Sequence, residues 1–145
     1  MIPGTMSNGG SFLHRWSPIF LSILRIVAGL LILEHGTQKL FHFPPSGHPA
    51  EGPLPPLMVV GGWIECVCGA LLVLGLFTRV AGFFLSGEMA VAYFMFHAQG
   101  SLFPIINKGE LAVISCFVFL YFVFAGAGPW SADHAMRKAS GARSP

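Results

Sequence analysis

Ionisable side chains interrupt the most apolar stretches of this chain. They lie within or at the ends of those stretches, at Arg25, Glu34, His35, Lys39, Glu65, Glu88 and Glu110. A charge at membrane depth costs roughly 2.5–3.5 kcal/mol by insertion scales, so such residues normally face the interior of a helix bundle and have a function. Histidine titrates near neutral pH, and a buried carboxyl group holds its proton more readily than an exposed one. In an apolar slot between helices, His35, Lys39 and Glu88 could exchange protons with the ring oxygens of a quinone.

We therefore predict two overlapping sets of site residues. The predicted catalytic residues are His35, Lys39, Glu65 and Glu88. The predicted cofactor-binding residues are Arg25, His35, Glu110 and Tyr121, with a quinone as the candidate cofactor. A metal site is not expected, because helix bundles that bind two iron ions use Glu-x-x-His pairs and the chain has none. Its cysteines, Cys66, Cys68 and Cys116, form no Cys-x-x-Cys motif and are expected to be small packing residues.

Four apolar segments must position these side chains. Each has roughly the 20 residues that cross about 30 Å of hydrocarbon, and only a helix satisfies every backbone group within one isolated span. The expected helices are residues 18–41, 57–77, 80–98 and 109–126. The sequence thus predicts an all-α membrane protein, an antiparallel bundle of four transmembrane helices at residues 18–127. A polar, mobile segment at residues 1–17 and a polar cytoplasmic tail at residues 128–145 are expected to flank it, and Thr78-Arg79 is expected to be the turn between helices two and three.

Helical periodicity brings some of the polar residues together. At about 100° per residue, Arg25, Gly29 and Lys39 share one stripe of the first helix, and Glu34 lies opposite. At about 1.5 Å per residue, Glu34, Glu65 and Glu88 lie roughly 10 to 15 Å below the outer surface. Carboxylates at one level cannot all stay ionised and unpaired, so some are expected to be protonated or paired.

The candidate pairs are Arg25 with Glu88 and Lys39 with Glu65. A purely structural role, in which the pairs only fix the packing of the helices, explains them about as well as a role in catalysis or binding does. The number of ionisable groups favours an outward-facing polar cavity. On an α-helix, however, Glu88 and His97 fall on opposite faces.

The distribution of basic residues predicts the orientation. Most are near the N-terminus, in the second loop and in the tail, at Arg15, Arg79, Arg137, Lys138 and Arg143. Positively charged loops stay in the cytoplasm, so both termini are predicted inside, in a bacterial inner membrane. A cleaved secretory signal is not expected, because the first apolar run contains Arg25 and has no small-residue cleavage site.

The composition supports a membrane protein and excludes other classes. Of the 145 residues, 54% are hydrophobic and 10% are charged, against about 25% charged in soluble domains. The formal net charge is +2, and no basic run or aromatic–basic array indicates nucleic-acid binding. The bilayer is therefore the expected partner, and homo-oligomers remain open.

Several motifs, taken in order, resemble the DoxX family of small four-helix membrane proteins. They are LRIVAGLLILEHGTQKL, GGWIECVCGALLVLGLFTRVAG, GEMAVAYF, NKGELAV and GAGPWSAD, and they extend over nearly the whole chain. The residues that match the family pattern include Arg25, His35, Lys39, Glu65, Arg79, Glu88 and Glu110. Glu34 does not belong to that pattern.

The resemblance implies a membrane component of a quinone-linked redox system, associated with thiosulfate oxidation or thiol stress. Such a component would work with soluble or membrane-bound redox proteins as partners, and it would be a subunit of an oxidoreductase. Two alternatives stay open. The chain can be a non-enzymatic anchor or scaffold for soluble redox enzymes, or a pathway for protons or small solutes.

Overall fold

The described part of the chain, residues 9–45 and 52–141 of this computed structural model, consists of helices and their connections, with no strand. The elements are α1 (Gly9–Phe41), α2 (Pro56–Leu74), α3 (Thr78–Ala92), the π-helix η1 (Tyr93–His97), α4 (Pro104–Asn107), α5 (Glu110–Ala125) and α6 (Ala132–Gly141). The predicted all-α class is confirmed. The expectations for residues 1–8, 46–51 and 142–145 lie outside the described residues.

Three stretches of helix are long and apolar enough to cross a membrane. They are Phe12–Phe41 in α1, Pro56–Leu74, and Thr78–His97, in which η1 continues α3. α5 is equally apolar in character but has only 16 residues. Large apolar side chains such as Val67, Phe83 and Ile114 are exposed on the outside of the molecule. That distribution suits a bilayer as the surrounding solvent.

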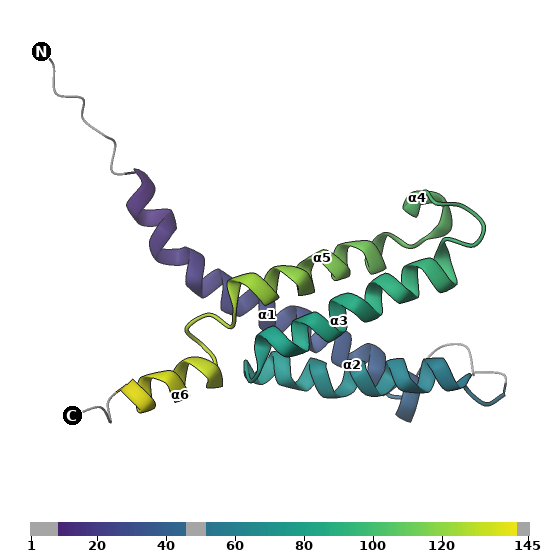
Figure 1. Cartoon of the computed structure of the whole chain (residues 1–145), viewed down its shortest axis with the longest axis horizontal. Helices are drawn as coiled ribbons and strands as arrows, with labels where there is room; N and C mark the ends of the chain where they lie inside the picture. Colours follow the sequence, from purple (N-terminus) through teal and green to yellow (C-terminus); the bar gives the residue numbers. More distant parts are fainter. Residues whose placement is uncertain (1–8, 46–51, 142–145) are drawn as a thin grey trace, which may run out of the picture.

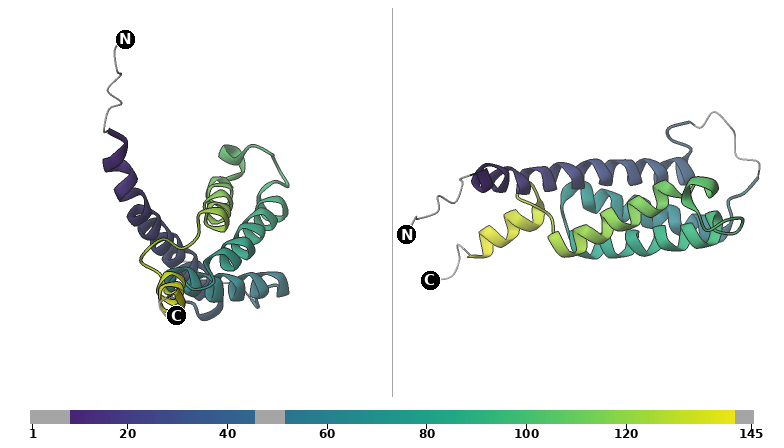
Figure 2. Two further views of the ribbon diagram at one scale, coloured as in Figure 1. Left: turned by 60° about the vertical axis from the view of Figure 1, so that its left-hand side comes forward. Right: turned by 90° about the horizontal axis from the view of Figure 1, so that it is seen from above.

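The long helices run along a common direction, with α1 against α2, α2 against α3, and α3 against α5 (Figure 2). Glycines let α1 and α2 approach closely. A Cβ atom at Gly36 would lie 2.7 Å from the backbone nitrogen of Cys66, and one at Gly29 would lie 2.9 Å from that of Val73. Small residues at a helix crossing allow this close approach. The predicted stripe of Arg25, Gly29 and Lys39 thus faces α2.

The turn between α2 and α3 lies at Gly75–Phe77, before the expected Thr78-Arg79 turn. Gly75 adopts a left-handed conformation with φ 66°, and its N–H bonds to the Leu72 carbonyl at 3.1 Å. Thr78 begins α3, and Asp133 of α6 accepts hydrogen bonds from the N–H groups of Phe77 (2.9 Å) and Thr78 (3.1 Å). The carboxylate of α6 therefore satisfies the free N–H groups at the start of α3.

Two polar segments are more helical than the sequence predicts. α1 begins at Gly9, inside the segment expected to be mobile, and its first part projects beyond the other helices (Figure 1). Phe12 and Trp16 lie four residues apart, with ring centroids separated by 6.2 Å, and such pairs stabilise a helix. Within the tail, α6 is docked by a bond from Asp133 N to the Gly75 carbonyl at 2.9 Å. This tertiary contact holds a helix that composition alone did not indicate.

Candidate functional site

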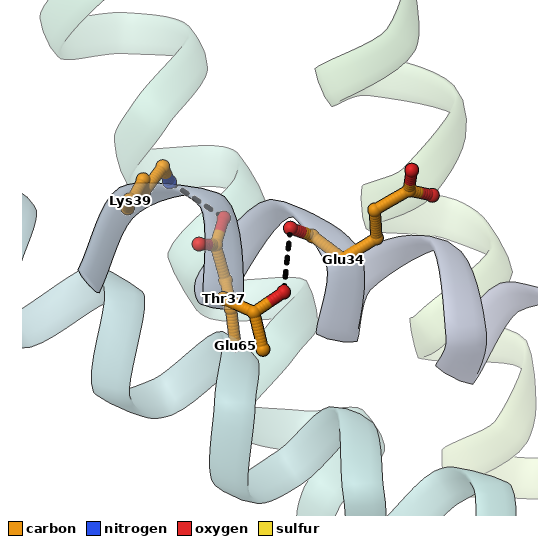
Figure 3. A network of polar contacts seen from close by, with 4 residues as sticks. All are labelled: Glu34, Thr37, Lys39 and Glu65. Carbon is orange, nitrogen blue, oxygen red and sulfur yellow. Dashed lines mark hydrogen bonds and ion pairs between the residues drawn. The ribbon is translucent and has the colours of Figure 1, made fainter. Parts of the chain in front are cut away.

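An ion pair joins α1 to α2 near the end of the molecule where α1 ends. Lys39 Nζ lies 2.6 Å from Glu65 Oε1 (Figure 3). The Glu65 side chain is 2% exposed, whereas that of Lys39 is 35% exposed. Among the described residues this is the only ion pair. The ammonium group of Lys39 neutralises the Glu65 carboxylate, whose burial without a partner would have a high cost in free energy.

Glu88 brings a second carboxyl group to the same place from α3. Its Oε1 atom lies 2.8 Å from the position that a Cβ atom would take at Gly61. Gly61 and Glu65 are one helical turn apart on α2, so both carboxyl groups lie along the same side of that helix. Glu65 Oε2 and Glu88 Oε2 are buried and have no hydrogen-bond partner among the described residues. Buried polar atoms normally have partners, so this pair of oxygens leaves bonding capacity for a proton or a ligand.

A cleft of about 570 Å³ opens beside Glu88, between α2 and α3. Apolar side chains make up most of its wall, including Met58, Ile64, Phe84 and Phe96. Its charged or titratable lining residues are Lys39, Glu88 and His97. A mostly apolar cleft with a few converging polar groups is the usual form of a small-molecule site. The cluster of Lys39, Glu65, Glu88 and His97 is hereafter the acid–base cluster.

His97 belongs to this cleft because the helix changes its winding. The expected α-helix would have turned His97 away from Glu88, but Tyr93–His97 form a π-helix. A π-helix takes more residues per turn, which rotates the residues after it, and such insertions are frequent at functional sites. His97 Nδ1 lies 3.1 Å from the Asn107 carbonyl oxygen. Because a carbonyl oxygen only accepts, Nδ1 is the donor, and in the neutral form of the ring Nε2 is then an acceptor.

Asn107 organises the loop that holds His97. Its side-chain nitrogen donates to the Ser101 carbonyl at 2.8 Å and to the Tyr93 hydroxyl at 3.3 Å, and its side-chain oxygen accepts from Gly109 N at 2.7 Å. The Tyr93 hydroxyl donates to the Leu102 carbonyl at 2.7 Å. Helical periodicity did not indicate His97 or Asn107 as site residues, because the π-helix has no clear sequence signature.

Arg25 lies outside the acid–base cluster, which corrects the expected pairing with Glu88. Its side chain is fully buried. Nε donates to the Ala127 carbonyl at 2.8 Å and Nη1 to the Val73 carbonyl at 3.0 Å, and the Leu72 and Trp130 carbonyls accept further bonds. The guanidinium group thus joins α1 to the end of α2 and to the α5–α6 connection. The planar fork of arginine can reach several carbonyls at once.

Three other predicted residues also lie apart from the cleft. His35 is exposed and lines a different groove, of about 250 Å³, between α1 and α5. Glu110 is exposed at the first position of α5, and Tyr121 is exposed near the other end of that helix. The structure therefore brings together Lys39, Glu65 and Glu88 of the predicted set. It does not bring His35, Glu110 and Tyr121 to them.

Glu34 and the cysteines make no contribution to the cluster. The Glu34 side chain is exposed and points away from the Lys39–Glu65 pair, and its backbone carbonyl accepts a bond from Thr37 Oγ1 at 3.1 Å (Figure 3). All three cysteines are free thiols, and Cys116 Sγ lies 3.5 Å from Ser86 Oγ. Within residues 9–45 and 52–141, no group of three His, Cys, Asp or Glu side chains is placed to hold a metal ion.

The amino-acid sequence is similar to those of other proteins. A family model described as DoxX matches residues 20–98, which include Lys39, Glu65, Glu88 and His97. An uncharacterised protein of Haemophilus influenzae is 48% identical over 128 residues, covering 84% of this chain and 94% of the relative. An uncharacterised membrane protein of Mycobacterium tuberculosis is 28% identical over 152 residues, covering 90% of this chain and 91% of the relative. No solved structure matches the chain.

Proposed function

Because this chain belongs to the DoxX family of membrane proteins, we propose that it is the membrane component of a redox system and binds a quinone in the α2–α3 cleft. The observation that carries the proposal is the buried, unpartnered Oε2 atom of Glu88 at the wall of an otherwise apolar cleft. An apolar ring fits such a wall, and a ring carbonyl would give a protonated Glu88 the acceptor that it lacks.

The acid–base cluster supplies what a quinone ring requires from a protein. A bound quinone would supply the redox chemistry, since its carbonyl oxygens take up protons as the ring takes up electrons. The ammonium group of Lys39 pairs with Glu65 and leaves Glu88 without a cationic partner among the described residues, so we assign the proton of the cluster to Glu88. Glu88 is then the hydrogen-bond donor at the cleft wall, and the ammonium group of Lys39 neutralises the carboxylate of Glu65. His97 stands at the same wall with Nε2 free to accept a proton. Electrons would come from a soluble or membrane-bound redox partner protein.

The same proposal includes four crossings of the bacterial inner membrane, with both termini in the cytoplasm. α6 contacts the α2–α3 turn through the bond from Asp133 N to the Gly75 carbonyl. The α3–α5 connection lies at the other end of α3, so the chain must cross back along α5 to reach α6. Arg79, Arg137 and Lys138 lie at the α6 end, which the distribution of basic residues places inside. Ser101→Cys and Ser140→Cys, each in a chain whose Cys66, Cys68 and Cys116 are replaced by Ala, test this orientation in intact cells. The cysteine at position 101 should react with an impermeant reagent, and the one at position 140 should not.

A pathway for solutes through the bundle gains no support from the packing. Leu72, Leu85 and Phe122 are completely buried, and Arg25 is enclosed by carbonyl groups. These side chains fill the interior toward the α6 end. The acid–base cluster is therefore open toward the α2–α3 cleft rather than continuous with the opposite side.

Quinone binding can be tested on the full chain in mild detergent. We expect a short-tailed naphthoquinone analogue to bind the natural chain, and Glu88→Met to weaken binding by about tenfold, as the loss of one buried hydrogen bond predicts. His35→Ala is the matched control, because His35 lies in the other groove. Equal binding of the analogue by the natural chain, Glu88→Met and His35→Ala would show that the analogue does not bind in the α2–α3 cleft. Redox proteins that co-purify with a chain unable to bind the analogue would support the scaffold alternative.

A further inference from the structure

A basic pocket of about 430 Å³ lies at the end of the molecule opposite the acid–base cluster. Arg79 of α3 and His134 and Arg137 of α6 line it, together with the α5–α6 connection at residues 125–129. His134 and Arg137 are three residues apart, so both side chains lie on one face of α6. Pro18 and Leu21 of α1 form the apolar part of the wall. The pocket thus combines cationic groups with an apolar edge.

The two arginines of this pocket form no ion pair within the described residues, and the one acidic residue beside them is Asp133, which lines an adjoining depression with both. Arg79 Nη1 donates to backbone carbonyls at the end of α5, including that of Phe124 at 3.0 Å, and neither Arg79 nor Arg137 forms an ion pair there. The nearby carboxylate of Asp133 already accepts from two backbone N–H groups, those of Phe77 and Thr78. Arginine binds phosphate oxygens through its planar set of donors. An anion is therefore the complementary ligand.

An apolar groove continues from the pocket along α1 and α5. Leu21 lines both the basic pocket and a depression of about 380 Å³ that also includes Phe20, Leu24 and Tyr121. Leu24 in turn lines the groove of about 250 Å³ between α1 and α5, which extends past Leu31 to His35. The groove exists because α1 and α5 pack on α2 and α3 and scarcely on each other. Its length suits an extended hydrocarbon chain.

We propose that an anionic phospholipid binds here, with its phosphate against Arg79, His134 and Arg137 and one acyl chain in the α1–α5 groove. The charge of the pocket selects an anionic headgroup, and the groove that leads from it selects a diacyl lipid over a free phosphate ion. Basic pockets between the ends of membrane helices bind acidic headgroups in this way. The site shares no side chain with the acid–base cluster, so it stands independently of the quinone proposal.

The test uses the delipidated full chain in detergent, with thermal unfolding as the readout, because a ligand that binds the native state raises Tm. Dioleoylphosphatidylglycerol is expected to raise Tm with increasing concentration, and dioleoylphosphatidylcholine and inorganic phosphate are not. Arg137→Gln should weaken the phosphatidylglycerol effect by about fivefold, as the loss of one basic contact predicts. Lys138→Gln is the matched control, since Lys138 is exposed on the same helix and does not line the pocket.

A second pair of variants tests the groove. Leu24→Trp should fill it and weaken phosphatidylglycerol binding while both arginines remain, whereas Val67→Trp, on an exposed face of α2, should not. An equal effect of phosphatidylcholine, or equal behaviour of Arg137→Gln and Lys138→Gln, would overturn the headgroup site. Two results would show that the occupant is not a lipid. One is a rise in Tm with inorganic phosphate as large as the rise with phosphatidylglycerol. The other is equal binding of phosphatidylglycerol by Leu24→Trp and Val67→Trp.

Discussion

The carboxyl group of Glu88 on α3 lies against Gly61 on α2. The Glu88 Oε1 atom is 2.8 Å from the position that a Cβ atom would take at Gly61. The absence of a side chain on α2 thus allows the carboxyl group of α3 to lie against that helix. It also places Glu88 beside the Lys39–Glu65 pair. The position of the proposed proton donor depends on a glycine as much as on the glutamate itself.

Gly61→Ala should displace the Glu88 carboxyl group without removing it. The obstructing atom is the far end of a flexible side chain, so Glu88 can rotate away and the fold should persist. Alanine gains about 1 kcal/mol over glycine in helix propensity, which offsets part of the steric cost. We expect weaker binding of the naphthoquinone analogue with Tm close to that of the natural chain. Gly141→Ala on α6, where a Cβ atom meets nothing within 4 Å and which lies outside the cleft, is the control, and equal binding by both variants would contradict the arrangement.

Lys39→Met should destabilise the fold because it leaves the buried Glu65 carboxylate without its partner. Removal of one member of a buried pair costs about 3–5 kcal/mol, and the partial exposure of Lys39 favours the lower end of that range. Adding Glu65→Leu should recover most of the loss, since both charges are then absent. Unfolding of the two single variants and the double variant forms a double-mutant cycle. Additive losses would show that the two side chains do not interact.

Arg25→Met should destabilise the fold through the carbonyl groups that it leaves unpaired. Buried acceptors without partners cost about 1–3 kcal/mol each, so a total loss of about 3 kcal/mol or more is expected. Arg25→Lys should rescue only part of it, because an ammonium group cannot reach the carbonyls of α2 and of the α5–α6 connection together. The measurement is thermal unfolding in detergent, with exposed Arg15→Met as the control. If folded Arg25→Met binds the naphthoquinone analogue as the natural chain does, the role of Arg25 is structural and not a role in the cleft.

Asp133→Ala should loosen α6 and the start of α3 together. The loss of a capping carboxylate costs about 1 kcal/mol, and here it removes two bonds to backbone N–H groups. Hydrogen exchange at the amides of Phe77 and Thr78 should become faster. Trypsin should cleave α6 sooner at Arg137 and Lys138. Ser140→Ala on the exposed part of α6 serves as the control, and unaltered exchange at both amides would contradict the cap.

The class of the protein follows from its composition and its apolar runs. An apolar content of 54%, few charges and apolar runs of about span length require helices that meet a bilayer, whatever their arrangement. Periodicity placed Arg25, Gly29 and Lys39 on one face of α1, and that face packs on α2. Lys39 with Glu65 was one of the two candidate pairs from the sequence, and the structure confirms that these two side chains meet, at 2.6 Å.

Which of the polar residues meet depends on the packing of the helices and on one change of helical winding. The π-helix turns His97 into the cleft of Glu88, whereas sequence periodicity assumes one uniform winding. The partners of Arg25 are carbonyl groups, which every residue possesses and which no side-chain pattern reveals. His35 and Lys39 are one helical turn apart on α1, yet Lys39 lines the α2–α3 cleft and His35 lines the groove between α1 and α5. Local spacing fixes the direction of a side chain from its helix, but contacts distant in the chain fix what lies there.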